Sequence, residues 1–280
     1  MTARPTLDLA GHLDRVRTGS PLIHNITNHV SMNIMANVLL AVGASPAMAH
    51  AREEVAELAA LANALTINIG TPSPHWVDAM QDAARAARAA ATPWVLDPVA
   101  VGATTYRRDI GARLLALSPS VIRGNASEIL ALALANRPNQ HSGGRGADST
   151  ASTHSARGAA ISLALSSGAV VTVTGEVDLV TDGRQIARIE GGHPLMPKVT
   201  ALGCSLSGVV AAWIAGAIND SEDIFLATTA ALASYAVAGE LAGRVAQGPG
   251  SFSVAFLDAL YMLDGDTLSQ HARLEITDAS

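Results

Sequence analysis

The chain has 280 residues, of which 49% are hydrophobic, 15% are charged and 3% are aromatic, and its formal net charge is −6. This length allows one large domain or two small ones, and an acidic balance without a basic stripe argues against a nucleic-acid partner. Cys204 is the single cysteine. It excludes an internal disulfide, and together with an N-terminus that lacks the apolar core of a signal peptide it favours the cytoplasm.

Strand-like and helix-like segments alternate along the chain. In order, the sequence predicts helix 28–42, strand 64–70, helix 73–90, strand 94–98, helix 105–117, strand 121–124, helix 126–136, strand 169–175, hairpin strands 177–181 and 184–190, and helices 204–218, 223–246 and 251–263. Repeated strand–helix units predict an α/β fold with a mainly parallel central sheet and helices on both faces.

Three segments bear on the domain organisation. The apolar runs 206–218 and 224–238 are each shorter than the roughly 20 residues that span a bilayer, so we expect buried helices and no membrane partner. Residues 137–157 are polar and rich in Gly, Ser and Thr, which predicts a flexible surface loop. We expect a single domain over residues 1–280, with residues 265–280 as a tail.

Several polar residues follow directly after predicted strands. Ligands of parallel sheets bind beyond the carboxyl ends of the strands, so these residues form a candidate site: Asn68, Gly70, Thr71, Asp97, Arg123, Asn125, Thr174 and Gly175. Each also has a structural alternative. Asp97 could cap a turn, Arg123 could form a salt bridge, and Glu128 could complete a capping box with Asn125.

The lone cysteine stands in a glycine-containing turn at the start of an apolar helix, Thr200-Ala201-Leu202-Gly203-Cys204. Free N–H groups at a helix start can hold an anion, and a thiol placed there is expected to have a lowered pKa and to act as a base or nucleophile. The alternative is a small buried apolar residue. The sequence has no Walker loop and no Gly-x-Gly-x-x-Gly, so a phosphate site would use a different helix start.

Five motifs in order resemble the hydroxyethylthiazole kinase family of the ribokinase-like superfamily, over about residues 20–260. They are Ile23-His24-Asn25-Ile26-Thr27-Asn28, Leu65-Thr66-Ile67-Asn68-Ile69-Gly70-Thr71, Val95-Leu96-Asp97-Pro98-Val99-Ala100-Val101-Gly102-Ala103-Thr104, Ile122-Arg123-Gly124-Asn125-Ala126-Ser127-Glu128-Ile129 and the Cys204 turn. The resemblance implies a ribokinase-like fold and a homotrimer with active sites between subunits. It also implies ATP-dependent, Mg²⁺-requiring phosphorylation of the hydroxyl of 4-methyl-5-(2-hydroxyethyl)thiazole in the thiamine pathway.

The resemblance also implies roles for individual residues. ATP would contact Arg123, Thr174 and Gly203, and Asp97 and Glu128 would serve the metal. Cys204 would occupy the position where most superfamily members carry an aspartate base. The residues implied near the thiazole are Asn25, Met48, Gly70, Thr71 and Ala201.

One departure from the family pattern lies in the cysteine turn. The family usually reads Thr-Gly-Thr-Gly-Cys, whereas this chain has Ala201 and Leu202 in the middle. Ala201 lacks glycine's freedom at positive φ. The departure leaves two alternatives open: a kinase for a related heterocyclic alcohol such as a hydroxymethylpyrimidine, and a non-catalytic protein that binds ATP and the thiazole.

Overall fold

The computed structural model describes residues 7–136, 153–219 and 224–279. Its sheet has nine strands in the order β2-β1-β3-β4-β5-β6-β7-β8-β9. The strands are β1 (Leu22–Ile26), β2 (Ser45–Ala47), β3 (Ala64–Asn68), β4 (Trp94–Asp97), β5 (Val121–Asn125), β6 (Val170–Thr174), β7 (Val177–Thr181), β8 (Gln185–Glu190) and β9 (Arg273–Asp278).

The helices are α1 (Leu9–Gly19), α2 (Met32–Val42), α3 (Val55–Leu61), α4 (Pro74–Ala89), α5 (Thr105–Leu115), α6 (Ala126–Ala135), α7 (Thr153–Ser167), α8 (Leu202–Asn219), α9 (Ile224–Val245), α10 (Pro249–Met262) and α11 (Gly265–His271). A short 3₁₀ helix, η1 (Met196–Lys198), precedes α8. In the sheet order, neighbouring strands are parallel from β2 through β1 to β6, and neighbouring strands are antiparallel from β6 to β9. The predicted mainly parallel sheet is confirmed.

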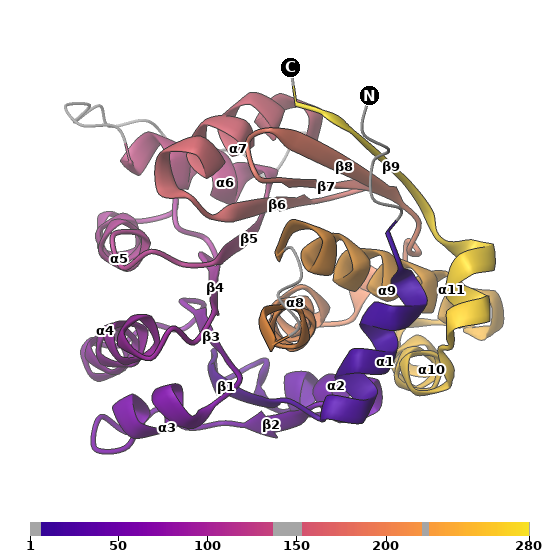
Figure 1. Ribbon diagram of the computed structural model, residues 1–280, viewed down its shortest axis with the longest axis horizontal. Helices are drawn as coiled ribbons and strands as arrows, with labels where there is room; N and C mark the ends of the chain where they lie inside the picture. The colour runs from indigo at the N-terminus through magenta and orange to yellow at the C-terminus, as the bar shows by residue number, and fades with distance from the viewer. Residues whose placement is uncertain (1–6, 137–152, 220–223, 280) are drawn as a thin grey trace.

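Helices cover both faces of the sheet, as the sequence predicts. Helices α3 to α7 lie on one face, and α1, α2 and α8 to α11 lie on the other (Figure 1). Each face has its own apolar core. All five residues of β3 are buried, because helices enclose a parallel strand from both sides.

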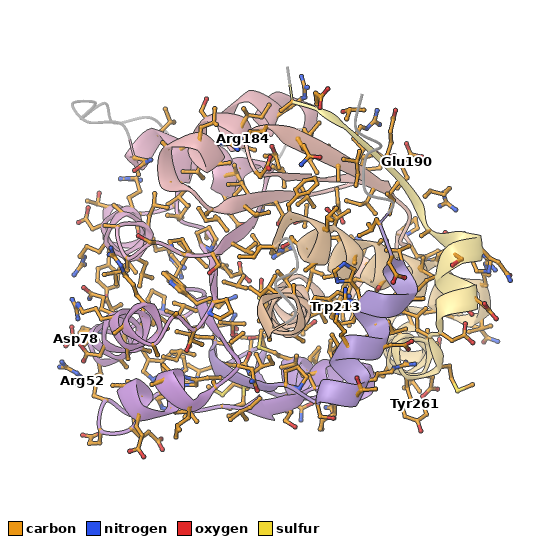
Figure 2. The ribbon with its side chains drawn as sticks, viewed as in Figure 1. Arg52, Asp78, Arg184, Glu190, Trp213 and Tyr261 are labelled. Carbon is orange, nitrogen blue, oxygen red and sulfur yellow. The ribbon has the colours of Figure 1, made fainter. Side chains whose placement is uncertain are left out.

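The two long apolar helices lie inside the molecule. Helix α9 is long and apolar enough to cross a membrane, yet most of its apolar stretch is buried in the protein. Trp213 of α8 is also buried, and it lies in the interior between α8 and α1 (Figure 2). Both helices are therefore core helices, which agrees with the expectation for runs 206–218 and 224–238.

The end of the chain differs from the expected tail. Within residues 265–280, α11 packs on α1 and α9, and β9 pairs with β8 from Arg273 to Asp278. Exposed and partly buried side chains alternate along most of β9. The strand can therefore pair with β8 although its sequence is not strongly apolar, and the sequence gives only a weak indication of a strand. The expected loop 137–157 falls largely outside the described residues, but its last five residues already belong to α7.

Candidate active site

The carboxyl ends of the parallel strands meet the start of α8 at one edge of the sheet. Register pairs Asn68 of β3 with Asp97 of β4, and Asn125 of β5 with Thr174 of β6. Helix α8 packs against β1, β3 and β4. The fold therefore brings Cys204 to the strand-end residues, although most of them lie far from it in sequence.

Asp97 is a fully buried carboxylate at the centre of this edge. Its Oδ2 accepts hydrogen bonds from Asn68 Nδ2 (2.7 Å) and Ser207 Oγ (2.9 Å) and lies 3.7 Å from Arg123 Nη1. Its Oδ1 is buried and has no hydrogen-bond partner among the described residues. Burial raises the pKa of Asp97 to about 7 although Arg123 opposes the rise. Its two hydrogen-bond donors are side chains and not backbone N–H groups of a turn.

Arg123 and Thr174, the two predicted ATP contacts, touch each other. Arg123 Nη2 donates to Thr174 Oγ1 at 2.8 Å, and Thr174 Oγ1 donates to the carbonyl of Gly124 at 3.3 Å. The third predicted contact, Gly203, lies beside them, because a Cβ placed on it would be 3.1 Å from Arg123 Nη2. All three candidates for ATP contact therefore lie together around the guanidinium of Arg123, and we call this group of residues the phosphate corner.

Glu128 forms the capping box that the sequence analysis gave as its structural alternative. Its Oε2 accepts from the Asn125 N–H at 2.8 Å, while Asn125 Oδ1 accepts from the Glu128 N–H at 3.0 Å, which completes the capping box of α6. Its Oε1 accepts from the Ala100 N–H at 2.9 Å. Both carboxylate oxygens thus already hold backbone groups, so direct metal contact competes with two hydrogen bonds.

Two asparagines join Cys204 to Asp97. Asn28 Nδ2 lies 3.4 Å from the sulfur of Cys204 and 2.9 Å from Asn68 Oδ1, and Asn68 Nδ2 in turn donates to Asp97. Sequence reasoning did not assign Asn28 to the site, and it named Asn68 only as a strand-end residue. The available signal was that Asn28 follows β1 by two residues and that Asn68 ends β3, where the register pairs it with Asp97.

The thiol of Cys204 differs from its expected state. Burial and the nearby charge of Asp97 raise the pKa of Cys204, outweighing Arg123 and the amide donors. The expectation of a lowered pKa was wrong, because it weighed the helix start without the low-dielectric surroundings. A thiol is therefore the resting form at neutral pH.

Alkylation provides a direct check on this thiol, since the chain has no other cysteine. We expect iodoacetamide to modify folded Cys204 at pH 8 several-fold more slowly than the urea-unfolded chain, because the thiolate is the reactive form. The rate in the folded protein is expected to keep rising above pH 9. A folded rate that exceeds the unfolded rate at pH 8 would contradict the raised pKa.

The residues implied near the thiazole do not all lie next to Cys204. Asn25 is buried inside the sheet, where its Nδ2 donates to the Ile23 carbonyl at 2.8 Å and its Oδ1 accepts from Thr66 Oγ1 at 2.8 Å. The Gly70 N–H donates to Asn68 Oδ1 at 2.9 Å, and Thr71 Oγ1 accepts from the His29 N–H at 3.2 Å. The structure thus places the Gly70–Thr71 turn beside the asparagines that reach Cys204.

Met48 and Ala201 complete the implied thiazole set. Met48 is partly buried and packs against the core on the α8 side of the sheet. Ala201 immediately precedes α8 and has φ of +63°. The left-handed conformation costs an alanine about 1–2 kcal/mol, so the departure from the family pattern places strain at the turn before Cys204.

Ala201→Gly is expected to raise the free energy of unfolding by about 0.5–1 kcal/mol, since relief of the strain exceeds the added flexibility of the unfolded chain. Ala91→Gly is the matched control, because Ala91 has φ of +57° at the end of α4. Denaturant titration measures both changes. Equal stabilisation, with a changed kcat only in Ala201→Gly, is the expected result; a destabilised Ala201→Gly protein would contradict it.

Comparison with known proteins identifies relatives of this chain. The model of the hydroxyethylthiazole kinase family matches residues 13–266. A hydroxyethylthiazole kinase of Cereibacter sphaeroides is 61% identical over 264 residues, covering 94% of this chain and 97% of that protein. The solved hydroxyethylthiazole kinase of Pyrococcus horikoshii OT3 is 36% identical, covers 96% of this chain and 98% of its own, and superposes with a TM-score of 0.86.

A more distant structure supports the fold alone. The pyridoxal kinase of Staphylococcus aureus in complex with ADP is 14% identical, with a TM-score of 0.63, and the match covers 92% of this chain and 98% of that chain. The sheet therefore has the ribokinase-like arrangement. With the family match over most of its length, the chain belongs to the hydroxyethylthiazole kinase family.

Proposed function

We propose that this protein transfers the γ-phosphoryl group of ATP to the hydroxyl of 4-methyl-5-(2-hydroxyethyl)thiazole, in thiamine biosynthesis or salvage. The observation that carries the proposal is the shared corner of Arg123, Thr174 and Gly203 beside Asp97 and Cys204. A cationic group, free helix N–H groups, a carboxylate and a proton acceptor are the components that phosphoryl transfer requires. Family membership supplies the choice of alcohol.

The phosphate end of the site uses charge and backbone donors. The guanidinium of Arg123 can bind phosphoryl oxygens with its planar fork. Gly203 in the first turn of α8 lies against the same guanidinium, and free N–H groups at a helix start favour an anion. Catalysis of phosphoryl transfer depends mainly on positioning and on neutralising charge around the moving group. These residues supply both effects without a Walker loop.

Asp97 has the features of a magnesium contact. Its Oδ1 is buried without a hydrogen-bond partner in the described part of the chain, and oxygen donors are the ligands that Mg²⁺ prefers. Within the described ranges no group of three or more His, Cys, Asp or Glu side chains could hold a metal. Mg²⁺ commonly keeps several waters and takes only one or two protein carboxylates besides phosphate oxygens. Asp97 would hold it directly and Glu128 through water, and the ion would neutralise phosphate charge.

We infer that Cys204 receives the proton of the substrate hydroxyl. Its sulfur stands at the start of α8 and accepts a hydrogen bond from Asn28, so negative charge that develops on sulfur meets a donor. In a loose transition state the hydroxyl proton leaves late, and a thiol with a raised pKa can still orient the hydroxyl. We therefore infer that the thiolate fraction of Cys204 accepts the hydroxyl proton, with no covalent intermediate on sulfur.

A direct assay tests the proposed function. Purified protein, ATP, Mg²⁺ and the thiazole alcohol are expected to yield the thiazole phosphate in equal amount to ADP, measured by ³¹P NMR and mass spectrometry. A hydroxymethylpyrimidine alcohol in parallel is expected to give a much lower kcat/KM. Binding of both ligands by calorimetry without product would refute the kinase and support a binding protein.

We also infer a single kinase domain over residues 1–280, a homotrimer and a cytoplasmic location. Large apolar side chains on the surface support assembly, among them Tyr261 near the end of α10 (Figure 2) and its neighbour Met262. Sedimentation of the purified protein is expected to give three times the mass of the 28.6 kDa chain. A monomer at assay concentration would refute the trimer.

A further inference from the structure

The buried tyrosine of α9 reaches the first turn of α8. The Tyr235 hydroxyl donates to the carbonyl of Leu202 at 2.7 Å. The Ser205 hydroxyl lies 3.0 Å from the same carbonyl oxygen and 2.8 Å from the Tyr235 oxygen. All three residues are buried, and burial raises the pKa of Tyr235, so its hydroxyl keeps the proton that it donates.

These hydroxyls hold one end of a peptide unit whose other end is in the candidate active site. The carbonyl of Leu202 and the N–H of Gly203 belong to the same planar trans peptide and point in opposite directions. Fixing the carbonyl therefore fixes the direction of the Gly203 N–H. Hydrogen bonds to a carbonyl also polarise its amide, which strengthens the N–H as a donor.

The rest of α9 secures the segment that leads into this turn. The Gly192 N–H donates to the Ala236 carbonyl at 3.0 Å. Gly239 and Gly243 lie so close to Met196 and His193 that a Cβ on either glycine would overlap their side chains. One face of α9 therefore holds both the connector from β8 and the first turn of α8.

We propose that Tyr235, assisted by Ser205, is a positioning residue that aims and polarises the Gly203 N–H toward the transferred phosphoryl group. The inference rests on the proposed kinase function. Tyr235 acts through a backbone amide and touches neither substrate. Its ring also packs edge-on against Phe256, with ring centroids 4.8 Å apart, so its hydroxyl can be removed without removing this packing.

The kinetic test compares Tyr235→Phe with Thr229→Val. Thr229 is the matched control, because its buried hydroxyl also donates to a backbone carbonyl of α9, that of Phe225, at 2.8 Å. A full oxyanion donor is worth about 10²–10³ in kcat, so loss of its aim is expected to lower kcat of Tyr235→Phe about tenfold. KM for the thiazole is expected to stay within about twofold, and Thr229→Val is expected to keep its kcat.

A second measurement does not depend on activity. Leu202-Gly203 is the only Leu-Gly pair in the sequence, so ¹³C-carbonyl leucine with ¹⁵N-glycine labels a single peptide bond. The amide signal of Gly203 is expected to move in Tyr235→Phe and to stay in place in Thr229→Val. An unmoved signal, a wild-type kcat in Tyr235→Phe, or an equal kcat loss in both variants would overturn the proposal.

The two measurements also separate this proposal from the function on which it rests. A wild-type protein that makes no thiazole phosphate refutes the proposed function, whatever the variants do. A wild-type enzyme that is active, with an unmoved Gly203 signal in Tyr235→Phe, refutes the positioning role alone. Assays run well below the melting temperature of each variant keep loss of folded protein out of the comparison.

Discussion

Asp97→Asn is expected to lower kcat by about a hundredfold or more, because it removes the carboxylate charge that faces the phosphate corner. The amide keeps nearly the shape of the carboxylate. The unpartnered Oδ1 of Asp97 is buried, so the variant removes the oxygen proposed to meet Mg²⁺ and leaves the backbone of β4 in place. Steady-state kinetics at varied ATP and Mg²⁺ concentrations measure the effect.

The control for this variant is Asp264→Asn. Asp264 caps α11, where its side chain accepts from the Thr267 N–H, and asparagine caps a helix about as well as aspartate. We expect the control to keep wild-type kcat. An Asp97→Asn enzyme within threefold of wild type at saturating Mg²⁺ would exclude Asp97 from the reaction.

Arg123→Met is expected to damage both activity and stability. The guanidinium holds Thr174 and lies 3.7 Å from Asp97 Oδ2, so its loss removes a phosphate-binding fork and leaves a buried carboxylate without its cation. We expect kcat/KM for ATP to fall about a thousandfold, and the free energy of unfolding to fall by about 3 kcal/mol at pH 8.

The stability loss in Arg123→Met depends on pH with a definite sign. Burial already raises the pKa of Asp97 to about 7, and removal of Arg123 raises it further. Above pH 4 the unfolded chain releases this proton while the folded variant retains it, so unfolding becomes easier as pH rises toward and beyond 7. Urea titrations at pH 6 and pH 8 are expected to show the smaller loss at pH 6.

A second arginine provides the comparison for Arg123. Arg108 lies on α5 and donates to the Gly102 carbonyl and to Thr105 Oγ1, each at 2.9 Å. We expect Arg108→Met to change kcat/KM by less than threefold and to lose stability equally at both pH values. An Arg123→Met protein that behaves like Arg108→Met would remove Arg123 from the phosphate corner.

The sequence predicted strands β3 to β8 and helices α2, α4, α5, α6, α8, α9 and α10, and it missed α1, β1, β2, α3, α7, α11 and β9. Helix α4 was found because its buried residues form one stripe after a proline at its start. Strand β2 has three residues and includes Pro46, so neither length nor composition marks it. Strand β9 is mostly polar and gains its order from pairing with β8, a contact that no local pattern contains.

The candidate site was predictable where local geometry decides the role. The capping box of Asn125 and Glu128 follows from their three-residue spacing, and the strand-end position of Asp97 follows from the apolar run before it. The raised pKa of Cys204 was not predictable, since it depends on burial and on Asp97, which lies 107 residues earlier. The Tyr235 contact likewise joins two helices whose sequences give no sign of it.

The contact between Asn28 and Cys204 has a consequence for synthesis of the chain. The two residues lie 176 positions apart, so a ribosome that makes about 5–20 residues per second leaves Asn28 without its partner for on the order of ten seconds or more. Strands β1 to β6 emerge in order and can pair with one another during that interval. Nucleotide binding by a nascent chain would therefore report that translation has passed α8, and stalled chains of graded length can time this event.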